Sequence, residues 1–192
     1  MNLQQEYLEK KQEIEKRLKE FRENKDFFYE LCFCLLTPQT KARNADLVIK
    51  QLKALDFKNK NFNPKKYLIG IRFHENKAKY LLELKNKFDV IPFNLNSRNL
   101  REYLVKNIKG ISWKESSHFL RNIGHKNLAI LDRHILSNLK YFNVINEIPK
   151  SMSKKQYLDI EDKFIEFSKK VNIPIDHLDL LFWSLKTGEI FK

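Results

Sequence analysis

Two helical patterns joined by a glycine turn are the feature that most constrains the fold. Residues 99–108 carry apolar side chains at helical spacing, and Gly110 interrupts the pattern. Glycine tolerates the left-handed backbone that ends helices. Ser112 and Glu115 then form an S-x-x-E capping box, in which each side chain satisfies a backbone N–H at a helix start. A second helical pattern runs on from there until Gly124. The stretch predicts a helical hairpin.

The second helix carries a lysine in its first turn. If Ser112 is the cap, Lys114 lies at the second helical position, where the helix dipole disfavours a positive charge. A lysine must be neutral to act as a nucleophile, so the position suits covalent catalysis. Asp132 follows 18 residues later and begins another helical pattern. The alternative, which involves no catalysis, is that Lys114 is an ordinary first-turn residue and that Asp132 is a helix N-cap.

The sequence pattern predicts helix for nearly all of the remaining chain as well. Apolar stripes, capping residues and prolines mark the ends of the segments. The predicted helices cover 3–23, 26–36, a segment from Ala42 to Leu55, 76–87, 97–108, 113–123, 133–142, 153–171 and 175–186. Extended runs such as Val90-Ile91 are short and isolated. The prediction is an all-α fold.

The charge balance indicates a polyanionic partner. The formal net charge is +13, and residues 50–66 hold six lysines against one aspartate, a candidate surface for a nucleic-acid backbone. Enrichment in Lys, Asn, Ile and Phe can also reflect an AT-rich genome. No stretch approaches a membrane span and the N-terminus is charged, so we expect no membrane and a cytoplasmic location.

The two cysteines and five histidines indicate no metal. Cys32 and Cys34 are two residues apart in an apolar helical run, so they form neither a Cys-x-x-Cys pair nor a four-cysteine cluster. The histidines show no ligand spacing. We expect no metal.

Residues 107–116, together with Asp132, resemble the helix-hairpin-helix DNA glycosylase superfamily. Within it the chain is most similar to the archaeal-type 8-oxoguanine DNA glycosylases. The other matching segments are 31–40, 71–73, 113–124, 131–134 and 180–192. Ser112 departs from the second glycine that many of these hairpins have, and the capping box accounts for it. The cysteine count excludes the iron–sulfur branch of the superfamily.

The resemblance implies a helix-hairpin-helix glycosylase fold of two helical lobes, with the active site in the cleft between them. We expect a single catalytic unit over residues 1–192. One lobe would span about 31–130 and contain the hairpin 100–124, and the other would combine 1–30 with 131–192.

The resemblance also assigns catalytic and DNA-binding residues. Lys114 and Asp132 fall where bifunctional members keep their catalytic pair. Gly110 and Ser112 would present the hairpin to the DNA backbone, and Gln39 would fill the gap left by a flipped base. The alternative for Gln39 is a plain turn between two helices.

By the same resemblance, three residues would hold the base. Trp183 would stack on it, and Phe73 would supply the opposite face. The main-chain carboxylate of Lys192 would accept from the N7–H that 8-oxoguanine has and guanine lacks. Alternatively, both aromatic residues belong to the core and the C-terminal lysine is frayed.

The implied function is base-excision DNA repair, as a multifunctional enzyme with glycosidase (hydrolase) and lyase activity. The partner would be double-stranded DNA containing 8-oxoguanine, with no cofactor and no obligatory protein partner, and the protein would associate with the nucleoid. Two alternatives stay open. One is a glycosylase for another damaged purine, and the other is a non-catalytic helix-hairpin-helix DNA-binding module.

Overall fold

The computed structural model describes residues 2–192, and within them every regular element is helical. The all-α prediction is confirmed. The chain divides into two compact units, one made of the described residues up to Asn24 together with Leu120–Lys192, the other of Lys25–Phe119. The boundary on the C-terminal side lies inside helix α6 (Trp113–Asn122).

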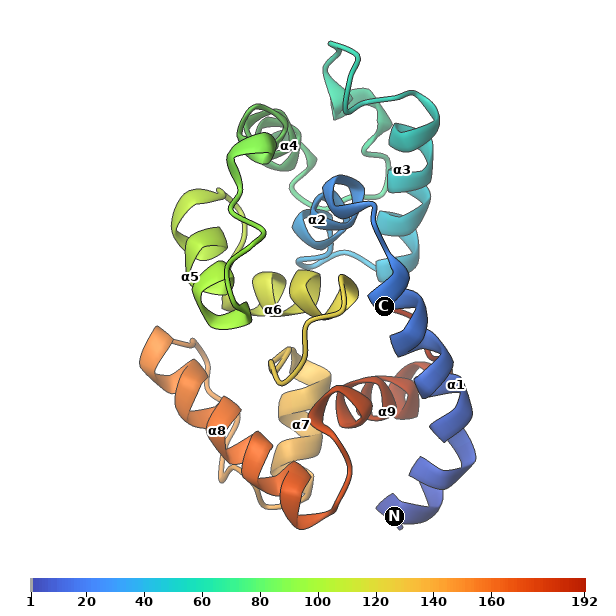
Figure 1. The fold of residues 1–192 in the computed structure, drawn as a ribbon, viewed down its shortest axis with the longest axis vertical. Coiled ribbons are helices and arrows are strands. Elements are labelled where there is room, and N and C mark those ends of the chain that lie inside the picture. Colours follow the sequence, from blue (N-terminus) through green and yellow to red (C-terminus); the bar gives the residue numbers. More distant parts are fainter. Residues whose placement is uncertain (1) are drawn as a thin grey trace. The chain divides into compact units, whose positions relative to one another are not determined.

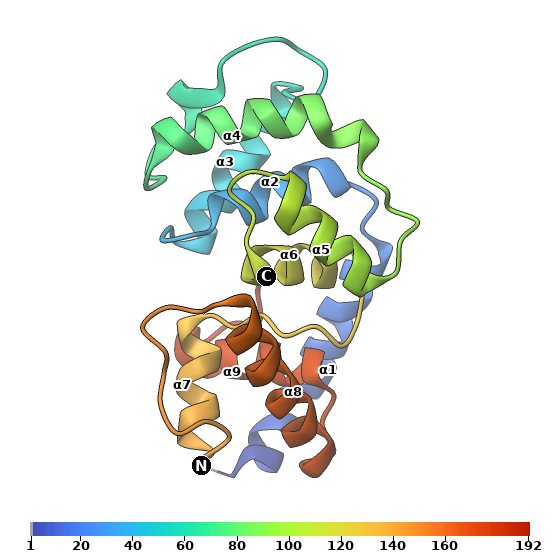
Figure 2. The ribbon, with the colours of Figure 1, turned by 90° about the vertical axis from the view of Figure 1, so that its left-hand side faces the viewer.

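The terminal unit, which combines the two ends of the chain, is built around one buried helix. Its elements are α1 (Leu3–Glu23), the end of α6, α7 (Arg133–Tyr141), α8 (Lys154–Lys170) and α9 (Ile175–Thr187). Helix α9 contacts α1, α7 and α8, and Figures 1 and 2 both show it between α1 and α7. Residues 178–182, four of them apolar together with Asp179, are all buried because neighbours cover several sides of the helix.

The central unit, Lys25–Phe119, is organised around α2. Its elements are α2 (Phe27–Leu36), α3 (Ala42–Ala54), the 3-10 turns η1 (Pro64–Tyr67) and η2 (Phe88–Val90), α4 (His74–Lys87), α5 (Ser97–Asn107) and the start of α6. Residues Phe28 to Leu36 are all buried, and α2 contacts α3 and α4. Phe28 lies edge-on to Phe88, with ring centroids 5.1 Å apart. Burial on all sides explains why the sequence of α2 is almost continuously apolar.

The unit boundaries lie at residues 24/25 and 119/120, where the sequence had suggested 30/31 and 130/131. Two observations show that the chain at and just after the end of α6 lies close to α1. Asn24 donates from Nδ2 to the carbonyl of Asn122 at 3.2 Å. A Cβ added to Gly124 would lie 2.9 Å from Cα of Arg22, so the backbones approach closely there.

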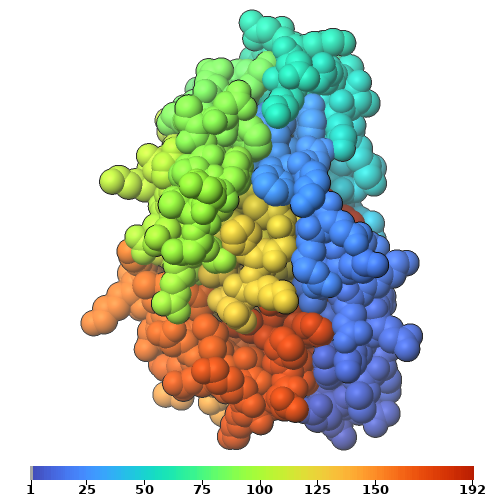
Figure 3. All heavy atoms as spheres, viewed as in Figure 1, coloured from blue at the N-terminus to red at the C-terminus, as the bar shows by residue number. Residues whose placement is uncertain are grey.

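The lysines of residues 50–66 are all exposed. Figure 3 shows side chains of this region (teal) at the surface. Three of the six, however, form ion pairs: Lys50 with Asp46, Lys53 with Asp26 and Lys65 with Glu75. The positive surface is therefore partly neutralised by the protein itself. No helix within residues 2–192 is long and apolar enough to cross a membrane.

Candidate active site

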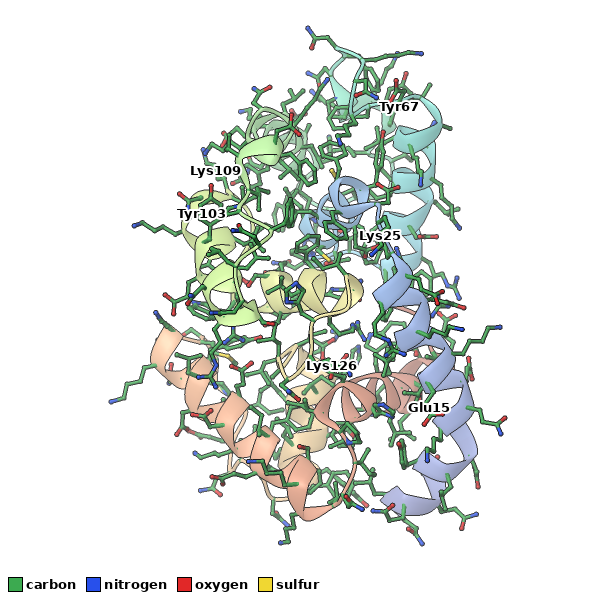
Figure 4. All side chains as sticks on the ribbon, viewed as in Figure 1. Glu15, Lys25, Tyr67, Tyr103, Lys109 and Lys126 are labelled. Atoms are coloured by element: carbon green, nitrogen blue, oxygen red, sulfur yellow. The ribbon has the colours of Figure 1, made fainter. Side chains whose placement is uncertain are left out.

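The hairpin turn between α5 and α6 requires a glycine on two counts. Gly110 has φ +85°, and a Cβ there would lie 2.5 Å from Cδ2 of Tyr80. Ile111 donates its N–H to the carbonyl of Ile108 at 3.2 Å, which closes the turn. Gly110 and Ser112 are exposed, so their backbone is open to a ligand. Figure 4 shows Tyr103 on α5 and Lys109 at the turn that follows it.

Glu115 organises the first turn of α6. Its Oε2 accepts from the N–H of Ser112 at 3.2 Å, the glutamate half of the predicted capping box, and the Ser112 hydroxyl donates to the same oxygen. Its Oε1 lies 2.8 Å from Nζ of Lys114. Burial alone would raise the pKa of Glu115, but the charge of Lys114 and the hydrogen bonds from Lys114 and Ser112 outweigh it and the pKa is lowered.

Lys114 itself is partly buried, with 24% of its side chain exposed. A helix start disfavours a positive charge, but the Glu115 carboxylate supplies a counter-charge to Lys114. The sequence does not predict this partner, because the S-x-x-E pattern indicates only a capping role for Glu115. The side chain is held at the surface of the central unit with an acidic neighbour.

Asp132 caps α7 in the terminal unit. Its Oδ1 accepts from the N–H groups of His134 and Ile135, each at 2.8 Å. The N-cap interpretation is therefore correct. It does not exclude a chemical role, because both capping bonds use one oxygen and Oδ2 lies outside the cap.

The same unit brings Trp183 close to the end of the chain. Helix α9 ends at Gly188, which has φ +78°. The chain then folds back, and Phe191 lies against Trp183 with ring centroids 6.4 Å apart. Thr187 stabilises this turn by donating to the carbonyls of Trp183 and Glu189. Lys192 is half-buried and follows a buried residue, which is unlike a frayed terminus.

Gln39 and Phe73 lie on two turns of the central unit that are joined by a hydrogen bond. The N–H of Arg72 donates to Oγ1 of Thr40 at 3.2 Å. Gln39 and Phe73 both adopt a left-handed backbone, with φ 55° and 58°. Phe73 is 51% exposed, and the guanidinium of Arg72 lies 5.1 Å from its ring centroid. The exposure of Phe73 argues against a core role.

Both cysteines are buried in α2, and neither forms a disulfide. Burial raises the pKa of the Cys32 thiol. Within residues 2–192, no group of three or more His, Cys, Asp or Glu side chains could hold a metal ion. A cavity in the terminal unit is lined by Arg22, Lys126 and Asp176 among others, and it includes none of the predicted site residues. Figure 4 labels Lys126.

The sequence matches the family model for 8-oxoguanine DNA glycosylase over residues 10–173. It is 44% identical to the 8-oxoguanine DNA glycosylase/AP lyase of Fusobacterium nucleatum over 207 aligned positions, which cover 97% of this chain and 94% of the relative. The enzyme of that name from Methanocaldococcus jannaschii is 39% identical, with 93% of this chain and 91% of the relative covered.

The fold is equally similar to solved structures. The M. jannaschii 8-oxoguanine glycosylase/lyase in complex with a 15mer DNA containing 8-oxoguanine superposes with a TM-score of 0.89 at 37% identity, covering all of both chains. The 8-oxoguanine DNA glycosylase of Thermotoga maritima gives 0.89 at 32% identity, covering 99% of this chain and 96% of that one. The predicted glycosylase fold is confirmed, and this chain belongs to the 8-oxoguanine DNA glycosylase family.

Proposed function

We propose that this protein removes 8-oxoguanine from double-stranded DNA and then nicks the abasic strand. The observation that carries the proposal is the end-to-end similarity to the M. jannaschii glycosylase/lyase solved with DNA containing 8-oxoguanine. The net charge of +13 suits a DNA partner. We propose that it acts on the nucleoid, because that is where such a substrate lies.

Lys114 is the proposed nucleophile. Lys114 first gives up its ammonium proton to solvent, and the neutral amine then attacks C1′ of the deoxyribose while the N-glycosidic bond breaks. The base departs with the bonding electrons and takes up the proton that the attacking nitrogen loses. Ring opening then gives an iminium on Lys114, which acts as the electron sink. Loss of a C2′ proton and cleavage of the C3′–O bond nick the strand, and water finally releases the enzyme. These steps need no cofactor.

Glu115 has a separate role in this scheme. Its pKa is lowered, so it is a poor acceptor for the Lys114 proton near neutral pH. We assign it the role of counter-ion, which orients the amine at 2.8 Å before substrate arrives. Asp132 is assigned the role of stabilising the positive charge that develops on the sugar, because its second carboxylate oxygen lies outside the helix cap.

Base recognition is assigned to Trp183, Phe73 and the carboxylate of Lys192. The ring of Trp183 packs beside that of Phe191, and a side chain already in contact with a neighbour loses less entropy when a base stacks on it. Phe73 offers an exposed ring held beside Arg72. The ordered tail supports a role for the terminal carboxylate as the acceptor for N7–H of 8-oxoguanine.

DNA contacts are assigned to the exposed turns of the central unit. Gly110 and Ser112 offer exposed main chain at the start of α6, where a phosphate is favoured. Gln39 is exposed on its turn and can occupy the space left by the flipped nucleotide. A glycosylase for a different damaged purine would share these contacts, so the substrate has to be tested directly.

A borohydride trap tests the proposal. An end-labelled duplex with one 8-oxoguanine opposite cytosine is compared with an undamaged duplex and a duplex carrying a ready-made abasic site. Wild-type protein should give a covalent band with the lesion and the abasic site, and Lys114→Gln should give neither. A band with the abasic site alone would refute the substrate assignment. No band with either duplex, from a folded protein that binds DNA, would favour the non-catalytic module.

A further inference from the structure

Lys77 is a buried lysine outside the site described above. It lies on α4 with 5% of its surface exposed, an uncommon place for a lysine. Its Nζ donates to the carbonyl of Leu36 at 2.8 Å, the carbonyl of Pro38 at 2.7 Å and Oγ1 of Thr40 at 3.1 Å. Three acceptors match the three hydrogens of an ammonium group. Burial, and next the charge of Lys114, lower the pKa of Lys77 to about 8.

These acceptors lie at the last residue of α2 and in the turn that follows it, which carries Gln39. The Thr40 N–H donates to the carbonyl of Thr37 at 2.9 Å, so the turn is closed by one main-chain bond. The Lys77 ammonium group adds three more bonds from inside the turn. An ammonium group is costly to bury, and a methionine could fill a similar volume without that cost. The bonds to the turn are therefore what this lysine contributes.

The same hydroxyl joins a second turn to the first. Oγ1 of Thr40 accepts from Lys77 and also from the N–H of Arg72, which precedes Phe73. Gln39 and Phe73 both hold left-handed backbone angles that non-glycine residues rarely adopt. Such angles persist only where the surroundings fix them. Lys77 and Thr40 form that fixed support.

We propose that Lys77 is a positioning residue for base extrusion, and that through Thr40 it holds Gln39 and Phe73 as one preformed surface. The inference rests on the proposed function and on the roles assigned there to Gln39 and Phe73. Base extrusion is costly, and a surface that is ordered before DNA arrives loses less entropy on binding. Lys77 is buried, and its three hydrogen bonds go to the end of α2 and the turn that carries Gln39. Its charge also interacts with that of Lys114, so trapping at an abasic site is measured beside excision.

The first test compares Lys77→Met with a matched control on the same helix. Lys85 also donates to a loop carbonyl, that of Lys60 at 2.6 Å, but it is only partly buried and its loop carries no residue assigned to base extrusion. Two rates are measured for each variant: single-turnover excision of 8-oxoguanine, and borohydride trapping at a ready-made abasic site. Lys77→Met should lower excision at least tenfold and leave trapping within about threefold of wild type. Lys85→Met should leave both within about threefold.

A second test follows the extrusion itself and avoids a buried substitution. 2-Aminopurine placed beside the lesion brightens when the neighbouring base leaves the stack. Thr40→Val, which removes the shared hydroxyl, should lose most of this signal, and Thr40→Ser should retain it. Gln39→Ala should lose part of it. In the Gln39→Ala background, Lys77→Met should reduce excision by a smaller factor than in wild type, because part of its effect runs through Gln39.

The outcomes separate this inference from the proposed function. If wild-type protein traps on neither duplex, the proposed function fails. If wild type is active and Lys77→Met matches Lys85→Met, the positioning role is wrong. It is equally wrong if Lys77→Met lowers excision and trapping by the same factor. Should Lys77→Met not fold, the comparison of Thr40→Val with Thr40→Ser decides, and equal signals from the two would overturn the inference.

Discussion

Replacing Gly110 by alanine should destabilise the hairpin by an amount that can be divided into two parts. The left-handed backbone at φ +85° costs a non-glycine residue about 1–2 kcal/mol. The new Cβ would also lie 2.5 Å from Cδ2 and 3.1 Å from Cε2 of Tyr80. Contacts this short force the ring to move, and overpacking of this kind costs about 1–3 kcal/mol. The expected total loss of unfolding free energy is about 2–5 kcal/mol.

Gly188 provides the control for the backbone part. It has φ +78°, and a Cβ there meets nothing within 4 Å. Gly188→Ala should therefore cost only about 1–2 kcal/mol. Urea unfolding at 25 °C, followed by far-UV circular dichroism, measures both variants against wild type.

The contact with Tyr80 is isolated by a double-variant cycle. In a Tyr80→Ala background the ring atoms are gone, so Gly110→Ala should cost no more than Gly188→Ala does in the wild type. If Gly110→Ala costs the same with and without the ring, the steric argument is refuted. If it costs nothing in either background, the backbone argument is refuted as well.

Three further predictions concern the proposed site and its surroundings. Asp132→Asn retains the capping acceptor and should change the free energy of unfolding by only a few tenths of a kcal/mol, whereas Asp132→Ala should lose about 1 kcal/mol. Both variants should lower the rate of single-turnover excision at least tenfold. An active Asp132→Asn would contradict the role of the Asp132 charge. Burial raises the pKa of Asp179 to about 7 from 3.8, even though Nη1 of Arg121 lies 3.0 Å from its Oδ2 and opposes the shift, so between about pH 4 and pH 7 the folded protein binds more protons at this group than the unfolded chain does. Stability should therefore fall as pH rises through that window. Thermal melts should show a smaller fall in melting temperature for Asp179→Asn than for wild type. Parallel curves of melting temperature against pH for the two proteins would refute this assignment. Lys192→Ala keeps the terminal carboxylate and should still discriminate 8-oxoguanine from guanine. Deletion of Lys192 should lower this discrimination about tenfold or more in competing-substrate assays, since a hydrogen bond to a charged group contributes about 1.5–3 kcal/mol. Equal discrimination by the two variants would exclude the carboxylate as the acceptor.

Helix positions followed closely from the sequence because they depend on neighbours three or four residues apart. The prediction of 26–36 is realised as Phe27–Leu36, and that of 153–171 as Lys154–Lys170 with its capping box intact. The 3-10 turns at Pro64–Tyr67 and Phe88–Val90 were not predicted. Each lasts a single turn, too short to leave a periodic signal.

The start of α4 shows the limit of local reasoning. The helix was predicted from residue 76 and begins at His74, directly after Phe73 in a left-handed conformation. Nothing in the local sequence marks this conformation, because neither glycine nor asparagine occupies the position. The left-handed conformation depends on the hydrogen bond from the N–H of Arg72 to Oγ1 of Thr40, and these two residues are 32 positions apart in the chain.

By itself the sequence determined the all-α fold, the glycine turn of the hairpin and the lysine at the start of α6, since periodicity, left-handed turns and capping are properties of short segments. Only the tertiary structure decided what those residues touch. It placed Glu115 Oε1 2.8 Å from the amine of Lys114 and folded Phe191 against Trp183. It also buried Lys77 beneath the turn of Gln39, 38 residues away in the chain. Such contacts depend on how separate helices pack, which no local pattern encodes.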